Sequence, residues 1–381
     1  MTAFSWSSFD IVRFFLFFFY FFTFISLVLF FLNCISKNTE INSLVFSAFV
    51  LYILSILSTI ANFYSQRNFF GSLLNQSFWF ASFVFFFFLT KNFNSNKLPQ
   101  LYRILLFFLF LFCTTYIIWV LSNPTNPLPI SINAIYYPIF LFPLFFLIKN
   151  PIAKSVLALL VFFATFLSNK RTAVLALILA VFIPFIFSAF LKKHDNRKRS
   201  VISLFLLCIA LIIAYNIVYE NFDIDVWARF KSIEEDRGSN RFDIYAKVFS
   251  EIKELNFFDA LLGKGFNGVF LASSLSTSAH NDFLEVFYDF GIMGFICYII
   301  FIVKIVSFNI PLFRSNSPFA LSYLSSTIIF LVFSVTSHVI LYPTYFFYIL
   351  FFWSIAISDY EKQININSEV KTIENRNCNL S

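Results

Sequence analysis

Apolar stretches of about 20 residues recur along this chain from end to end, and they constrain the fold more than any other feature. A helix of that length crosses the roughly 30 Å of hydrocarbon in a bilayer. Only 12% of the 381 residues are charged, whereas a soluble domain would carry about 25%. The apolar runs are continuous rather than alternating with polar residues, which argues against a membrane β-barrel. The sequence therefore predicts an all-α polytopic membrane protein.

About eleven transmembrane helices, within a range of about 10 to 12, are predicted from these runs. The chain divides into N-terminal helices over 1–219, a large loop over 220–281, C-terminal helices over 282–357 and a tail over 358–381. The tail is polar and rich in Asn, so it is predicted to be disordered. The individual spans are predicted at 11–32, 41–61, 70–90, 101–121, 130–148, 152–168, 172–191, 201–219, 282–306, 317–337 and 340–357.

The net charge of +7 lies mostly in short loops between the apolar runs, so it indicates orientation rather than nucleic-acid binding. Basic loops face the cytoplasm, and the strongest basic cluster lies within 192–199. The loop over 220–281 is then predicted to lie outside, and the tail inside. The short turn over 168–171 also falls outside, where Lys170 and Arg171 contradict the charge rule. They either cap a helix end or serve a local function.

The outside loop concentrates the polar residues of the chain. Ten of the 20 acidic residues lie within 220–259, and six of the seven glycines lie within 238–294. This composition predicts a folded, water-facing element, because tight turns need Gly and lipid-facing helices avoid carboxylates. Apolar residues at helical spacing predict an amphipathic helix over 241–255 on the membrane surface, with Ser239 or Asn240 as its N-cap.

Residues 263–268 match the G-x-G-x-x-G pattern of dinucleotide-binding proteins. That pattern requires a preceding strand, a following helix and a βαβ unit, and none of these is predicted around this loop. A tight glycine-rich turn is therefore expected here instead of a dinucleotide site.

A histidine, an amide and carboxylates follow, where the loop returns into an apolar helix. Polar groups beside hydrocarbon are costly, so the functional site is expected here. Asp282, Glu285 and Asp289 are spaced so that they share one helical face. They face a polar cavity or a cationic partner, for which Arg171 and Arg241 are the natural candidates, or they cap the positive N-terminal end of the helix.

The three histidines differ in their surroundings. His280 precedes Asn281 and is the candidate acid–base group, because histidine exchanges protons near neutral pH; the alternative is a helix-end hydrogen bond. His338 is expected to be a hydrogen-bonded packing residue at the outer end of a helix, and His194 to be solvated in the cytoplasmic loop. Histidines this scattered, and cysteines without ligand spacing, predict no metal site.

These residues resemble the O-antigen polymerase and O-antigen ligase superfamily over about residues 165–300. Members of that superfamily carry a Ser-x-Arg-Thr-type turn, an Arg in a large periplasmic loop, a His-Asn-x-x-Leu motif, and a helix with an acidic-x-Gly-hydrophobic-x-Gly pattern. The corresponding elements here are Ser168-Asn169-Lys170-Arg171-Thr172, then Arg241, then His280-Asn281-Asp282-Phe283-Leu284, then Asp289-Phe290-Gly291-Ile292-Met293-Gly294. Lys170 is an extra residue within the Ser-to-Arg spacing.

The resemblance implies a glycosyltransferase of the bacterial inner membrane whose active face is periplasmic. The donor would be an oligosaccharide on undecaprenyl diphosphate, and the other partners would be the lipid bilayer and a chain-length regulator protein. Arg171, Arg241 and Lys170 would hold the diphosphate, and His280 would deprotonate the acceptor hydroxyl, with inversion at the anomeric carbon. No metal or cofactor is implied. Four residues would have supporting roles: Asn281, Asp282, Glu285 and Asp289.

Three functions remain open at this point. The favoured one is an O-antigen polymerase, which transfers the growing glycan to another lipid-linked repeat unit. An O-antigen ligase would transfer it to the lipid A-core sugar instead. A transporter of lipid-linked oligosaccharides would carry its functional charges through many helices and often in repeats, whereas this chain concentrates them on one outside face.

Overall fold

The computed structural model describes Ile25, Val28 and residues 42–66, 69–92, 98–122, 133–191, 194–272, 277–340 and 342–378. Within these ranges the regular structure is helical and no strand occurs. The first helices are α2 (Ser43–Ala61), α3 (Phe69–Asn92), α4 (Leu98–Ser122), α6 (Tyr136–Leu141), the 3₁₀ helix η2 (Phe142–Leu147), α7 (Pro151–Leu167), α8 (Arg171–Leu191) and α9 (His194–Phe222). The last helices are α14 (Asp282–Ser307), the short α15 (Asn309–Arg314), α16 (Ala320–Thr336) and α17 (Pro343–Cys378).

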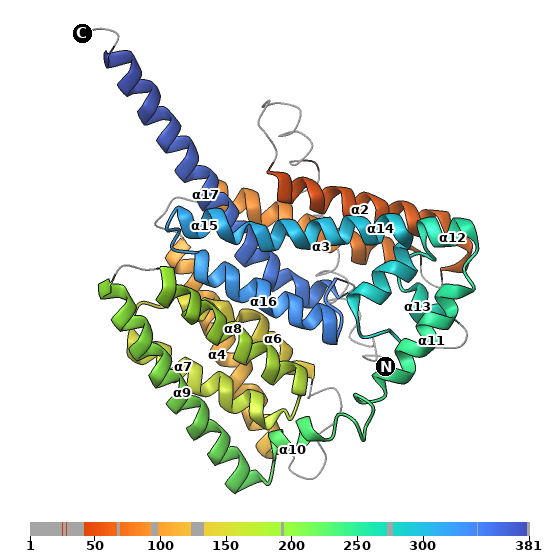
Figure 1. Cartoon of the computed structure of the whole chain (residues 1–381), viewed down its shortest axis with the longest axis horizontal. Helices are drawn as coiled ribbons and strands as arrows, with labels where there is room; N and C mark the ends of the chain where they lie inside the picture. Colours follow the sequence, from red (N-terminus) through yellow and green to blue (C-terminus); the bar gives the residue numbers. More distant parts are fainter. Residues whose placement is uncertain are drawn as a thin grey trace, which may run out of the picture.

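The helices form one bundle in which neighbours in space are often distant in sequence (Figure 1). The main pairs are α17 with α3, α14 with α2, α16 with α8, and α7 with α9. Aromatic residues fill the interior: the rings of Phe301, Phe330 and Phe346 surround the fully buried Trp353 at centroid distances of 6.0, 5.2 and 5.7 Å. Such edge-to-face pairs are favourable beyond the area they bury.

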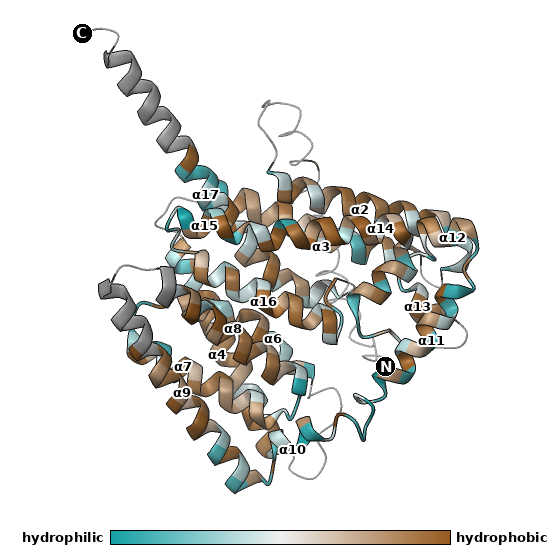
Figure 2. Ribbon diagram, in the orientation of Figure 1, coloured by the Kyte–Doolittle hydropathy of each residue, from teal (hydrophilic) through white to brown (hydrophobic). Residues whose placement is uncertain are grey.

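Six helices of the described part are long and apolar enough to cross a membrane: α2, α3, α4, α8, α9 and α14. Three shorter apolar helices occupy 136–147, 151–167 and 320–336. The all-α membrane prediction is thus confirmed in class, whereas the count of about eleven spans is not established, and the predicted span 11–32 lies largely outside the described residues. Figure 2 shows that hydrophobic residues dominate the long helices.

The C-terminal tail differs from its prediction. Composition predicts disorder from residue 358, yet α17 is helical as far as Cys378 and projects from the bundle (Figure 1). Its first polar turn is tied down, because Glu361 forms an ion pair with Lys91 at 3.2 Å and Lys362 donates to the Thr90 carbonyl at 2.9 Å. Extending an existing helix avoids the unfavourable nucleation step, which explains why a polar sequence continues it.

Four short helices make up the segment predicted as the outside loop: α10 (Val226–Lys231), α11 (Arg241–Lys253), α12 (Phe257–Leu262) and α13 (Gly268–Leu271). The last three pack beside the N-terminal end of α14 (Figure 1). The predicted amphipathic helix over 241–255 is confirmed as α11. Asn240 occupies its N-cap position, but in a left-handed conformation and without a side-chain capping bond.

Candidate functional site

The turn between α7 and α8 places two cations next to each other. Ser168 donates to the Thr165 carbonyl at 2.6 Å and accepts from the Lys170 amide at 3.3 Å. Asn169 adopts a left-handed conformation with φ of 50°, which Asn tolerates better than most residues. The turn is therefore tight, and it presents Lys170 and Arg171 at the start of α8.

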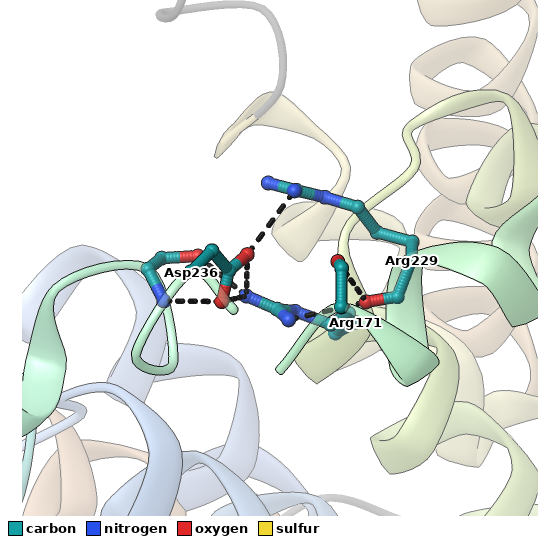
Figure 3. A network of polar contacts seen from close by, with 5 residues as sticks. Arg171, Arg229 and Asp236 are labelled. Atoms are coloured by element: carbon teal, nitrogen blue, oxygen red, sulfur yellow. Dashed lines mark hydrogen bonds and ion pairs between the residues drawn. The ribbon is translucent and has the colours of Figure 1, made fainter. Parts of the chain in front are cut away.

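Arg171 is held by the segment that follows α10 (Figure 3). Its Nη2 donates to both carboxylate oxygens of Asp236, at 2.9 and 3.2 Å, and to Ser239 Oγ at 2.6 Å. Its Nη1 donates to the Arg229 carbonyl at 3.1 Å, and the Arg229 side chain also bonds Asp236 at 3.2 Å. The Ser239 amide and the Arg171 guanidinium stabilise the carboxylate and hold the pKa of Asp236 below its usual value. The turn and the loop thus lie on the same side, as predicted.

Lys170 and Arg241 differ from Arg171, because neither forms an ion pair with any residue that the structure describes. Both are half-buried. Burial lowers the pKa of Lys170, and the nearby charges of Arg241 and Arg229 lower it further. Two cations without a counter-ion, close enough to repel each other, form a suitable site for an anion such as a phosphate group.

His280 lies next to these cations. Burial lowers its pKa to about 4, and the charges of Arg241 and Lys170 contribute, so its imidazole is neutral at neutral pH. Its backbone is left-handed, with φ of 53°, a conformation that costs energy in residues other than Gly and often marks functional sites. The N-cap of α14 is Asn281, whose Oδ1 accepts from the Phe283 amide at 2.9 Å. The His280 ring is therefore not the helix cap.

Of the alternatives for the carboxylate row, pairing with arginines is wrong for the described residues. Asp282 accepts from the Val339 amide at 3.0 Å, Glu285 from the Ala279 amide at 2.5 Å, and Asp289 from the Val269 amide at 3.0 Å. The three carboxylates do share one buried face of α14, but each binds backbone N–H groups of a different segment: the loop after α16, the loop before α14, and the start of α13. Helical spacing predicts a common face and does not identify the partner on it. The row fastens these three segments around the N-terminal end of α14.

The glycine pattern at 263–268 forms the tight turn that the sequence predicts. Gly263 and Gly265 both have φ of 82°, and the amide of Gly265 donates to the Asp289 carbonyl at 2.8 Å. That carbonyl is accessible because α14 is broken at Gly291, with φ of 66°. A Cβ on Gly263 would lie 2.3 Å from the Asp289 backbone. The turn therefore fits directly into the break of α14.

A comparison with known protein families covers most of this arrangement. Residues 156–299 match the O-antigen ligase family. The matched segment contains the α7–α8 turn, α11, His280 and the broken part of α14, so it supports assignment to the O-antigen polymerase and ligase superfamily. Members of this family are glycosyltransferase-like enzymes of O-antigen assembly. No curated protein and no solved structure matches the chain.

One contact at the site lies outside the matched segment. The ring of His338 stacks on that of His280, with centroids 4.9 Å apart and an interplanar angle of 20°. The expected hydrogen bond of His338 is present, because Ser278 Oγ lies 3.3 Å from its Nδ1. The stacking was not predicted, since the two histidines lie in separate segments and no sequence spacing relates them.

Proposed function

We propose that this chain is an O-antigen polymerase. It would transfer a growing glycan from undecaprenyl diphosphate to a sugar hydroxyl of another lipid-linked repeat unit, at the periplasmic face of the inner membrane. The observation that carries the proposal is a neutral histidine, His280, beside two cations, Lys170 and Arg241, that lack a counter-ion among the described residues. A base and an anion site next to each other are what this transfer requires.

Lys170 and Arg241 would bind the diphosphate of the donor. Arg offers a rigid fork that suits phosphate oxygens, and Lys adds a compact positive charge. A bound dianion would also favour the charged form of Lys170, which burial and neighbouring cations disfavour in its absence. Arg171 would act less directly, by fixing the turn that carries Lys170, because Asp236 already occupies its guanidinium group.

His280 would act as the general base. Its neutral imidazole takes the proton of the acceptor hydroxyl as the oxygen attacks the anomeric carbon of the donor sugar. The bond between that carbon and the diphosphate oxygen breaks, and undecaprenyl diphosphate leaves with its charge neutralised by Lys170 and Arg241. Attack opposite the leaving group inverts the anomeric carbon. The two cations supply the charge neutralisation, so the proposal requires no metal ion.

An O-antigen ligase is the second candidate, because the matched family carries that description. It would use the same donor, cations and base with a lipid A-core sugar as the acceptor. The decisive test is a lipopolysaccharide gel of a deletion strain, complemented with wild-type protein, with His280→Ala, or with His194→Ala as the matched control.

Core carrying a single repeat unit in the deletion strain, with the ladder restored by wild type and His194→Ala but not by His280→Ala, would support the polymerase. Bare core with accumulating lipid-linked polymer would identify the ligase. Loss of all lipid-linked material at the periplasmic face would favour the transporter, and a ladder restored by His280→Ala would rule out the base assignment.

A further inference from the structure

The His280 ring is one of three stacked rings. His338 lies against it at 4.9 Å, and Tyr342 stacks on His338 at 4.2 Å with an interplanar angle of 13°. Nearly parallel rings do not direct the N–H of one toward the nitrogen of the next, so this contact is not a proton relay. It fixes the plane of an imidazole and keeps water from one of its faces.

His338 is itself held firmly by the start of α14. It is 8% exposed, and its Nδ1 lies 3.3 Å from Ser278 Oγ. The following amide, that of Val339, donates to both Asp282 oxygens at 3.0 and 3.1 Å. Asn281 donates from Nδ2 to the Val335 carbonyl at 3.0 Å. The residues on both sides of His280 therefore also fasten the segment that carries His338.

We propose that His338 is a positioning residue, which holds the His280 imidazole in its plane by stacking while the nitrogens of that ring stay available to the acceptor hydroxyl. The base role of His280 rests on the proposed function, whereas the stacking and its effect on His280 do not. No hydrogen bond joins the His280 ring nitrogens to another described side chain. The stacked ring is thus the side-chain contact that sets the orientation of the base.

The proposal has a consequence for proton affinity. The groups that face His280 are Lys170 from the α7–α8 turn, Arg241 and Tyr245 from α11, Glu285 from α14, and His338. Burial is the main reason that the pKa of His280 falls to about 4. Removing the stacked ring admits water to one face of His280. Its pKa then rises toward the ordinary value of about 6.5.

The test uses the full-length purified protein and no substrate. Diethyl pyrocarbonate acylates the neutral form of a histidine side chain and not its protonated form. Site-resolved mass spectrometry separates His280 from the other two histidines. In the wild type, the rate of acylation at His280, corrected for reagent loss, should be constant between about pH 5.5 and 7.5. In His338→Ala and His338→Gln the rate should fall, by up to about tenfold, as the pH is lowered from about 7.5 to 5.5, because a group whose pKa has risen toward 6.5 becomes protonated in that interval.

His338→Phe keeps a flat ring and is the matched variant, for which a constant rate is expected. His338→Gln keeps a polar group for Ser278 and a similar volume, so it remains informative if the Ala variant does not fold. Constant rates in both His338→Gln and His338→Phe would overturn the proposal. A tenfold fall in His338→Phe together with a constant rate in His338→Gln would also overturn it, since the hydrogen bond rather than the ring would then be decisive.

Polymer formation by the same variants separates this inference from the proposed function. His338→Phe should retain most of the turnover, and His338→Gln should lose turnover with little change in KM. If His280→Ala still makes polymer while the acylation rates behave as expected, the polymerase mechanism fails and the positioning role of His338 stands.

Discussion

Asp236 accepts two hydrogen bonds from a single nitrogen of Arg171, and this pair joins the start of α8 to the segment between α10 and α11. The carboxylate offers that nitrogen the same kind of oxygen pair that a phosphate group would offer. One of the two arginines that the family resemblance assigns to the diphosphate is therefore already bound within the protein. The other two cations that the resemblance assigns there are Lys170, which precedes Arg171, and Arg241, which is distant in the sequence. Neither has such a partner among the described residues.

Arg171→Lys should reduce polymer formation without abolishing it. Lysine keeps the charge but cannot bond Asp236, Ser239 and the Arg229 carbonyl together, so the turn that carries Lys170 shifts. Displacements of about 1 Å at an active site cost up to roughly a hundredfold in rate. Turnover with a purified lipid-linked donor measures the effect, and Asp236→Asn should reproduce it. Undiminished turnover in both variants would remove Arg171 from any positioning role.

Lys170→Ala and Arg241→Ala should each lower kcat by roughly 10²–10³-fold, the usual effect of removing one group that stabilises developing charge. Arg241→Lys should recover part of the loss, because it restores the charge without the fork. Lys247→Ala is the matched control, since Lys247 is an exposed cation on the same helix. Equal losses in the control would show that α11 contributes general electrostatics rather than a specific contact.

The activity should persist in mildly acidic solution. His280 has a pKa of about 4, so its basic form predominates above that pH, and the acid limb of kcat/KM should lie near pH 4 rather than near 6.5. Arg241→Gln removes a charge that lowers this pKa, so its acid limb should move to higher pH. A pH–rate profile of the wild type and of Arg241→Gln measures the two acid limbs. An acid limb at the same pH in both proteins would contradict the assignment of His280 as the base.

The stability of the fold should decrease in acid for a related reason. His280 and His338 have pKa values of about 4 and about 3 in the folded protein, and about 6.5 when unfolded. The unfolded chain therefore binds more protons below pH 6.5, and stability is lost as the pH falls from there toward 4. Each histidine contributes up to about 1.4 kcal/mol per pH unit. Thermal unfolding in detergent should show a shallower acid dependence for the double variant His280→Gln, His338→Gln.

Gly263→Ala should destabilise the protein much more than Gly238→Ala. Both glycines are left-handed, with φ of 82° and 66°, so both substitutions incur backbone strain. A Cβ at Gly263 would also collide with the Asp289 backbone at 2.3 Å, whereas at Gly238 the nearest atom is 3.7 Å away. Thermal unfolding should show a loss of about 2–4 kcal/mol for the first and about 1 kcal/mol for the second. Equal losses would mean that the turn does not fit tightly into α14.

Much of the architecture follows from the sequence, because apolar length predicts spanning helices and apolar spacing predicts α11. The family resemblance assigns His280 and Arg241 to one site, and the structure brings them close enough for the charge of Arg241 to lower the pKa of His280. The sequence does not show that Arg171 is occupied while Lys170 is not, since the difference depends on Asp236, which is far away in the chain. The carboxylate row was misjudged for the same reason: spacing assigns Asp282 to a face, and the fold decides what lies opposite.

The break at Gly291 divides α14 into two parts that are held in place differently. The carboxylates and carbonyls of residues 282–290 fasten them to neighbouring segments, including the start of α13. A left-handed backbone conformation at Gly291 separates them from the apolar remainder of the helix. They therefore form a rim together with α11, α12 and α13, which pack against this part of α14. In the proposed polymerase, a lengthening glycan would move past this fastened rim, so each round of transfer would require exchange of substrates rather than a change in the shape of this region.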